Sequence, residues 1–230
     1  MKVLAICGID TGVGKSVVTG LLARWLLGRG ERVITMKPVQ TGGSGRAEDI
    51  LLHRRLMGIS WNSWDENGTT CPYLLPLPAS PHLAAHLAGV RVEVEQLDRA
   101  LAQLTAGHDR VLLEGVGGLL VPLTDELLLA DFLAQRRLPI LLVSSTRLGS
   151  INHTLLSLEA IRSRGLLLQG LICNHHPPAA PEIATDTPRL FRYWLKRLGF
   201  DCPLLTLGVD DSGSALCDFT PLFPPAPKST

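Results

Sequence analysis

The chain has 230 residues, of which 46% are hydrophobic and 19% are charged, and its formal net charge at pH 7 is +1. This length and balance predict one globular domain with a sizeable core, and the small net charge argues against a protein that binds nucleic acid through a basic surface. The five cysteines show no C-x-x-C spacing, which argues against a zinc site or a disulfide framework.

Short apolar runs alternate with longer amphipathic segments along the chain. The apolar runs predict buried strands over residues 3–7, 32–36, 110–113, 138–144 and 166–173. The amphipathic segments predict helices over residues 15–29, 48–57, 94–106, 126–136, 151–164 and 188–198. Strands separated in this way by helices indicate βαβ units. The sequence therefore predicts a single α/β domain over residues 1–220, with a mostly parallel sheet flanked by helices on both faces.

Two segments do not fit this alternation. Residues 60–81 contain Trp61, Trp64 and four prolines, so we expect an irregular excursion over the surface. Residues 221–230 are rich in proline and lack apolar periodicity, which predicts a disordered tail.

The first predicted strand leads into Gly8-Ile9-Asp10-Thr11-Gly12-Val13-Gly14-Lys15-Ser16, and a helix follows. This is the context of a P-loop, in which glycines let backbone N–H groups approach phosphates and a helix N-terminus adds positive potential. Lys15 would reach the β and γ phosphates of a nucleotide, and the Ser16 hydroxyl would be a ligand of Mg²⁺. The loop departs from the usual spacing, because Ile9 occupies the first glycine position and five residues separate Gly8 from Gly14.

Two carboxylates are candidates for further Mg²⁺ ligands, since Mg²⁺ prefers oxygen ligands. Glu114 follows a predicted strand and precedes Gly115-Val116-Gly117-Gly118, at the end of a parallel sheet where ligands bind. Asp49 lies near the start of a predicted helix, where it could equally be an acid that stabilises the helix dipole.

Lys37 closes the second predicted strand, and a lysine at that position is unfavourable unless an anion meets it. It is therefore a candidate for stabilising a transferring phosphoryl group, the alternative being a lysine that extends to solvent. Thr41, in the loop that follows, can offer its hydroxyl to a substrate.

Together these motifs resemble the dethiobiotin synthetase family. The resemblance rests on the phosphate loop with its extra residue and on four further segments in matching order. They are Lys37-Pro38-Val39-Gln40-Thr41-Gly42, Ser80-Pro81-His82-Leu83-Ala84-Ala85, Glu114-Gly115-Val116-Gly117-Gly118-Leu119 and Leu148-Gly149-Ser150-Ile151-Asn152-His153-Thr154. The resemblance implies an ATP- and Mg²⁺-dependent cyclo-ligase that joins 7,8-diaminononanoate and CO₂ into dethiobiotin, in biotin synthesis. A carbamate and a carbamic–phosphoric anhydride are the intermediates that it implies.

The resemblance also implies roles for individual residues. The catalytic residues would be Thr11, Lys15 and Lys37, and the ligands of Mg²⁺ would be Ser16, Asp49 and Glu114. The nucleotide would be bound by Gly12, Val13, Gly14, Lys15, Ser16, Val17, Asp49, Glu114, Gly115, Val116, Gly117 and Asn174, of which Asn174 would contact adenine. The diamine substrate would be bound by Thr41, Gly149, Ser150, Ile151 and Asn152. In the family, the segment around Gly149 comes from the partner subunit, which implies a homodimer with active sites at its interface.

Two departures from the family leave points open. Gly12 replaces an acid that some members carry, and residues 204–216 lack the Ile-Pro pattern expected near adenine, so the rest of the base pocket stays undefined.

The leading alternative is a switch ATPase of the partition or positioning type. Such proteins carry a second lysine in the phosphate loop, whereas this loop has only Lys15, and they usually carry a membrane helix or a basic DNA-binding surface. A cobyrinic acid diamide synthase would need a further glutaminase domain, and a nucleotide kinase would need an arginine-rich lid. The initial apolar run is too short for a signal peptide, and no apolar run reaches about 18 residues, so we expect a cytoplasmic protein that contacts neither membrane nor nucleic acid.

Overall fold

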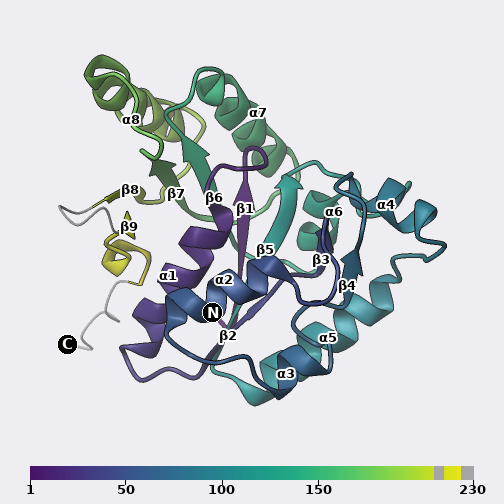
Figure 1. The fold of residues 1–230 in the computed structure, drawn as a ribbon. Coiled ribbons are helices and arrows are strands. Elements are labelled where there is room, and N and C mark those ends of the chain that lie inside the picture. The colour runs from purple at the N-terminus through teal and green to yellow at the C-terminus, as the bar shows by residue number, and fades with distance from the viewer. Residues whose placement is uncertain (210–214, 224–230) are drawn as a thin grey trace, which may run out of the picture.

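The computed structural model describes residues 1–209 and 215–223. Its centre is a seven-stranded sheet with the order β2-β5-β1-β6-β7-β8-β9, parallel throughout except for the pair β8–β9. The strands are β1 Val3–Gly8, β2 Val33–Met36, β5 Arg110–Gly118, β6 Ile140–Ser145, β7 Leu168–Asn174, β8 Leu204–Val209 and β9 Ala215–Leu216. The predicted α/β class with a mostly parallel sheet is confirmed (Figure 1).

Helices connect the strands and cover the sheet. They are α1 Lys15–Leu27, α2 Glu48–Met57, α3 Ser63–Glu66, α4 Pro81–Leu87, α5 Val94–Gly107, α6 Leu129–Gln135, α7 Ser150–Ser163 and α8 Pro181–Arg197, with a short 3₁₀ turn at Thr220–Leu222. In the view of Figure 1, α1 and α2 cross in front of the sheet. Within the described part of the chain, none of these helices combines the length and the apolar character needed to span a membrane.

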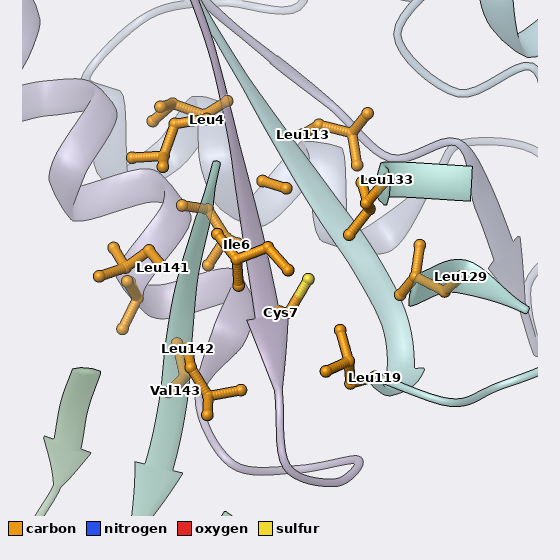
Figure 2. Close-up of a cluster of buried hydrophobic side chains, with 14 of the residues drawn as sticks. Leu4, Ile6, Cys7, Leu113, Leu119, Leu129, Leu133, Leu141, Leu142 and Val143 are labelled. Carbon is orange, nitrogen blue, oxygen red and sulfur yellow. The ribbon is translucent and has the colours of Figure 1, made fainter. Parts of the chain in front are cut away.

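The core lies on both faces of the central strands. Leu4, Ile6 and Cys7 of β1 are fully buried, as are Leu113 of β5 and Leu142 of β6. In Figure 2, Cys7 and Leu113 lie toward Leu129 and Leu133 of α6, whereas Leu4 lies on the other side of β1. A strand covered on both faces needs a continuous apolar run, which explains why these strands could be recognised from the sequence.

The strand order determines where a ligand can bind. β1 lies between β5 and β6, neither of which is its neighbour in the sequence, so the connections on its two sides run in opposite directions and leave a crevice at the carboxyl ends of the strands. The phosphate loop follows β1 at this crevice. Ile6 pairs with Glu114 and Gly8 with Gly118, and β2 ends at Met36, directly before Lys37.

The excursion predicted for residues 60–81 contains regular structure. α3 lies within it, and β4 (Tyr73–Leu75) forms a separate two-stranded parallel sheet with β3 (Val39–Thr41). The sequence analysis placed Thr41 in a loop, but Thr41 is the last residue of a short strand. Each of these strands has three residues, which is too short a sequence to indicate that the two segments pair.

Several element boundaries also differ from the prediction. α8 begins at Pro181, and Pro188 lies inside it. The predicted start was Pro188, but the proline in the first turn, where proline is favoured, is Pro181. α6 begins at Leu129 because residues before it are extended, with Leu128 bridging Pro122.

The C-terminal part of the chain adds two strands that were not predicted, β8 and β9. The 3₁₀ turn after them is packed: Leu222 is buried, and the Phe223 ring stacks on Trp25 with centroids 5.5 Å apart. Of the predicted tail, residues 221–223 thus belong to this packed segment, and residues 224–230 lie outside the described residues.

Candidate active site

The phosphate loop joins β1 to α1 with two left-handed glycines. Gly12 has a φ of 73° and Gly14, the N-cap of α1, has a φ of 96°. These angles are unfavourable for residues with a Cβ, so the glycines are what allow the turn that precedes the helix. Lys15 is buried, and its Nζ donates to the backbone oxygen of Asp10 at 2.7 Å, inside the same loop.

Four polar side chains from different elements meet beside this loop. The Ser16 hydroxyl lies 3.0 Å from Asp49 Oδ1 and 2.9 Å from Glu114 Oε1. Lys37 Nζ lies 2.7 Å from Asp49 Oδ2 and 2.7 Å from Glu114 Oε1. Ser16 is in the first turn of α1, Lys37 follows β2, Asp49 is in the first turn of α2 and Glu114 is in β5. The structure thus brings together the three predicted Mg²⁺ ligands and the second predicted lysine.

Charge pairing outweighs burial at this cluster. Burial alone would lower the pKa of the Lys37 ammonium, but Glu114 and Asp49 hold it above its ordinary value. Burial alone would raise the pKa of the Glu114 carboxyl, but Lys37 and His53 hold it well below its usual range. The pKa of the Lys15 ammonium is lowered to about 8. Burial is the larger cause, and the like charge of Lys37 adds to it. A bound phosphate would supply the anion that Lys15 lacks.

The donor set at this cluster fits Mg²⁺. Two carboxylates and one hydroxyl converge on a small region beside a phosphate loop, and such oxygen ligands are those that Mg²⁺ takes in nucleotide sites. Lys37 lies between the two carboxylates and balances part of their charge.

A cavity of about 750 Å³ opens over the cluster. Its walls come from the phosphate loop, from the β2–β3 region, from α2 and from residues 78–81. Of the predicted site residues, those that line it are Thr11, Gly12, Gly14, Lys15, Ser16, Val17, Lys37, Thr41, Asp49, Glu114, Val116 and Gly117. Val13 and Gly115, although predicted to bind the nucleotide, are not among the lining residues.

Asn174 lies behind the phosphate loop and outside the lining of this cavity. It is 5% exposed, its Nδ2 donates to the backbone oxygen of Val13 at 3.0 Å, and its Oδ1 accepts from the backbone N–H of His176 at 2.9 Å. In this conformation, Asn174 supports the backbone of the loop.

The predicted substrate-binding segment Gly149–Asn152 also lies outside the cavity of its own chain, at the start of α7. Ser150 is buried, with its hydroxyl 2.7 Å from that of Ser145, whereas Asn152 is exposed. Near it, Arg147 pairs with Asp10 of the phosphate loop at 2.8 Å, which links the two segments.

The sequence analysis missed several residues of the site. Gln40 lines the cavity and its Oε1 accepts from the backbone N–H of Asp49 at 3.1 Å. His53 is fully buried, with Nε2 2.6 Å from Glu114 Oε2. One signal was available for His53: it follows Asp49 by four positions on a helix, and residues at that spacing share a face.

Comparison with known proteins places this chain among close relatives. A family model described as an AAA domain matches residues 2–196. The ATP-dependent dethiobiotin synthetase BioD of Chlorobaculum tepidum is 51% identical over 209 residues, covering 90% of this chain and 87% of that protein. The ATP-dependent dethiobiotin synthetase BioD 2 of Pasteurella multocida is 43% identical over 196 residues, covering 85% of this chain and 92% of that protein. The resemblance drawn from the motifs is confirmed.

Among solved structures, the septum site-determining protein MinD of Pyrococcus horikoshii OT3, complexed with Mg-ADP, is similar with a TM-score of 0.51 and 19% identity. The match covers 91% of this chain and 82% of that chain. At this level of identity the likeness shows the fold alone, so it supports the P-loop NTPase-like architecture and does not favour the switch-ATPase alternative.

Proposed function

The chain belongs to the ATP-dependent dethiobiotin synthetase family, and we propose that it converts 7,8-diaminononanoate, CO₂ and ATP into dethiobiotin, ADP and phosphate. The observation that carries this proposal is the Lys37 ammonium, which lies beside the phosphate loop and is held by Asp49 and Glu114. A second buried cation at this position suits the transfer of a phosphoryl group more than simple retention of a nucleotide.

The reaction has three bond-forming steps. One amine of the substrate adds to CO₂ and loses a proton, which gives a carbamate. A carbamate oxygen then takes the γ-phosphoryl group of ATP, forming a carbamic–phosphoric anhydride and releasing ADP. The second amine attacks the carbonyl carbon of the anhydride, phosphate leaves, and the cyclic urea closes. Phosphorylation is needed because the carbamate oxygen is otherwise a poor leaving group.

In the proposed mechanism, the phosphate loop binds the nucleotide and Lys37 acts on the transferred group. Backbone N–H groups of residues 12–16, at the N-terminus of α1, would hold the phosphates together with Lys15. For this Lys15 would exchange its present acceptor, the backbone oxygen of Asp10, for phosphate oxygens. Lys37 and the hydroxyl of Thr11 would stabilise the negative charge that is shared between the carbamate and the γ-phosphoryl group.

The oxygens of Ser16, Asp49 and Glu114 would hold Mg²⁺. When bound, the ion would neutralise charge on the phosphates. Thr41, the last residue of β3, lines the same cavity, and its hydroxyl would hydrogen-bond to the diamine. We assign adenine contact to Asn174 through the amide hydrogen and the oxygen lone pair that its backbone contacts leave free.

The assay that tests this function measures phosphate release from MgATP with each substrate omitted in turn, and detects dethiobiotin by mass spectrometry. We expect product only when ATP, bicarbonate and 7,8-diaminononanoate are all present. ATP hydrolysis that ignores the diamine would contradict the proposal and favour the switch-ATPase alternative.

We also propose that two copies of the chain form a dimer in which Gly149–Asn152 of one copy complete the site of the other. Leu120 and Leu156 are 47% and 60% exposed and line a hollow of about 390 Å³ beside Ile9 and Asp10 of the phosphate loop. Leu148, before α7, is 98% exposed. Apolar side chains gathered on one face in this way are typical of a protein–protein interface.

Leu156→Asp tests the dimer, and Leu167→Asp is its matched control. Leu156 and Leu167 are 60% and 62% exposed, but Leu167 lies at the amino end of β7, away from the phosphate loop. We expect light scattering to show a dimer for the wild type and the control, and a monomer without turnover for Leu156→Asp. A wild type that turns over as a monomer would contradict this prediction.

A further inference from the structure

His53 lies behind the proposed metal ligands and has no role in the mechanism described above. Its side chain is fully buried on α2, one turn after Asp49. Its Nε2 is 2.6 Å from Oε2 of Glu114, and its Nδ1 is 3.0 Å from the hydroxyl oxygen of Thr35, in β2. A buried imidazole with both nitrogens in contact has its ring orientation fixed from two sides.

The contact with Thr35 continues to a buried ion pair. Arg54 Nη1 donates to the Thr35 hydroxyl oxygen at 2.8 Å, and the Arg54 guanidinium donates to both carboxylate oxygens of Asp65 at 2.9 and 2.7 Å. Asp65 in turn accepts from the Thr70 hydroxyl at 2.7 Å. Helix α3 is thereby connected, through Arg54, Thr35 and His53, to Glu114.

The contact with Glu114 identifies a ring nitrogen of His53 that carries a hydrogen. Because the carboxylate of Glu114 only accepts, Nε2 carries a hydrogen and donates it. On a neutral ring, Nδ1 then accepts from the Thr35 hydroxyl, whose oxygen accepts in turn from Arg54. A neutral ring with its hydrogen on Nε2 satisfies each of these groups.

The two oxygens of Glu114 have different partners. Oε2 accepts from His53, and Oε1 faces Ser16 and Lys37 at 2.9 and 2.7 Å. The bond from His53 therefore fixes the rotation of the carboxylate and leaves Oε1 directed at the cation position. Partners behind a metal-ligating carboxylate commonly have this effect on the ligand.

We propose that His53 is a positioning residue that orients Glu114 toward Mg²⁺, and that Thr35 acts through it by holding the ring at Nδ1. This inference rests on the proposed function, because it takes Glu114 as a metal ligand. Loss of the Thr35 hydroxyl leaves Nδ1 without its partner, so the ring is held at Nε2 alone and no longer fixes the rotation of the Glu114 carboxylate.

The experiment measures metal affinity without turnover, using Mn²⁺ as the probe and electron paramagnetic resonance to count free Mn²⁺ in the presence of ADP. We expect Thr35→Val to weaken Mn²⁺ affinity by about 10- to 100-fold, the range typical for loss of an outer partner of a metal ligand. Thr35→Ser, which keeps the hydroxyl, should restore affinity to within a few-fold of the wild type.

Thr70→Val is the matched control. It removes a buried threonine hydroxyl from the same network, at Asp65, but leaves the path from Arg54 to Glu114 intact. We expect it to lower the melting temperature and leave Mn²⁺ affinity unchanged.

In turnover assays, Thr35→Val should raise the Mg²⁺ concentration for half-maximal rate while much of kcat returns at saturating Mg²⁺.

A fourth variant, His53→Leu, tests whether Thr35 acts through His53. We expect Thr35→Val to have no further effect on Mn²⁺ affinity in the His53→Leu background, since residues of one network are not additive. Equal Mn²⁺ affinity in Thr35→Val and the wild type, or additive effects in the double variant, would overturn the proposed role of His53 and Thr35 and leave the proposed function in place. A wild type that binds no Mn²⁺ with ADP would remove the metal role of Glu114, and the proposed function and this inference would fall together.

Discussion

Lys37→Met is expected to lower kcat by at least about 10²- to 10³-fold, the loss seen when one fixed donor to a developing charge is removed. The substitution keeps much of the side-chain volume and removes the ammonium that lies 2.7 Å from both Asp49 Oδ2 and Glu114 Oε1. Nucleotide affinity should change less, because the phosphate loop and Lys15 remain. Steady-state turnover and ADP titration of the same preparation separate the two effects.

The same variant should reveal the electrostatic role of Lys37 in the absence of substrate. Without the ammonium, the carboxylates of Asp49 and Glu114 repel one another, and removing one partner of a buried pair costs about 3–5 kcal/mol. We therefore expect a lower melting temperature that Mg²⁺ raises by more than it raises that of the wild type. Lys196→Met, an exposed lysine on α8, is the control and should leave both properties unchanged. Wild-type turnover in Lys37→Met would show that the ammonium does not act on the transferred group.

Gly14→Ala is expected to abolish nucleotide binding at concentrations that saturate the wild type. Gly14 has a φ of +96°, and a Cβ built on it would lie 2.5 Å from Nδ2 of Asn174. The side chain of Asn174 is fixed by its bonds to Val13 and His176, so the loop itself must shift. Displacement of the loop removes the backbone N–H groups from the positions that a phosphate requires. Isothermal titration with ADP measures the loss.

Gly12→Ala separates backbone strain from this collision. Gly12 has a φ of +73°, but a Cβ there would meet no atom within 4 Å. Both variants carry the left-handed penalty of about 1–2 kcal/mol, and only Gly14→Ala carries the collision as well. In an Asn174→Ala background, Gly14→Ala should lose much less affinity than it does in the wild type. Equal losses for Gly12→Ala and Gly14→Ala would mean that strain, and not Asn174, accounts for the effect.

The parts of the site that the sequence predicted are those that depend on local rules. The phosphate loop needs glycines at fixed spacing between a strand and a helix, and all of these lie within nine consecutive residues. Lys37 and Glu114 were found because a charged residue that ends an apolar run is unusual in a buried strand. That reasoning placed Glu114 at the end of its strand, whereas β5 continues to Gly118, which still pairs with Gly8 of β1.

The parts that the sequence did not predict depend on contacts between distant segments. β3 and β4 have three residues each, and each forms a strand only because the other lies beside it. β8 was missed because its exposed positions interrupt the apolar run, although its pairing with β7 completes the parallel part of the sheet. His53 and Glu114 are separated by 61 positions. The position of His53 four residues after Asp49 indicates a shared helix face, but it does not identify Glu114 as the partner.

The place of β1 between β5 and β6 has a consequence for how the protein is made. Ser16 and Glu114 are 98 positions apart, and Lys37 and Glu114 are 77 apart, so the site combines groups that leave the ribosome at very different times. β1 pairs only with β5 and β6 among the described strands, and β2 only with β5. A nascent chain that ends before β5 has a complete phosphate loop but no sheet to hold it. Synthesis of β5 therefore gives β1 and β2 their first partner strand and brings Glu114 to Ser16 and Lys37, so we expect that a nascent chain does not bind ATP before that strand has emerged.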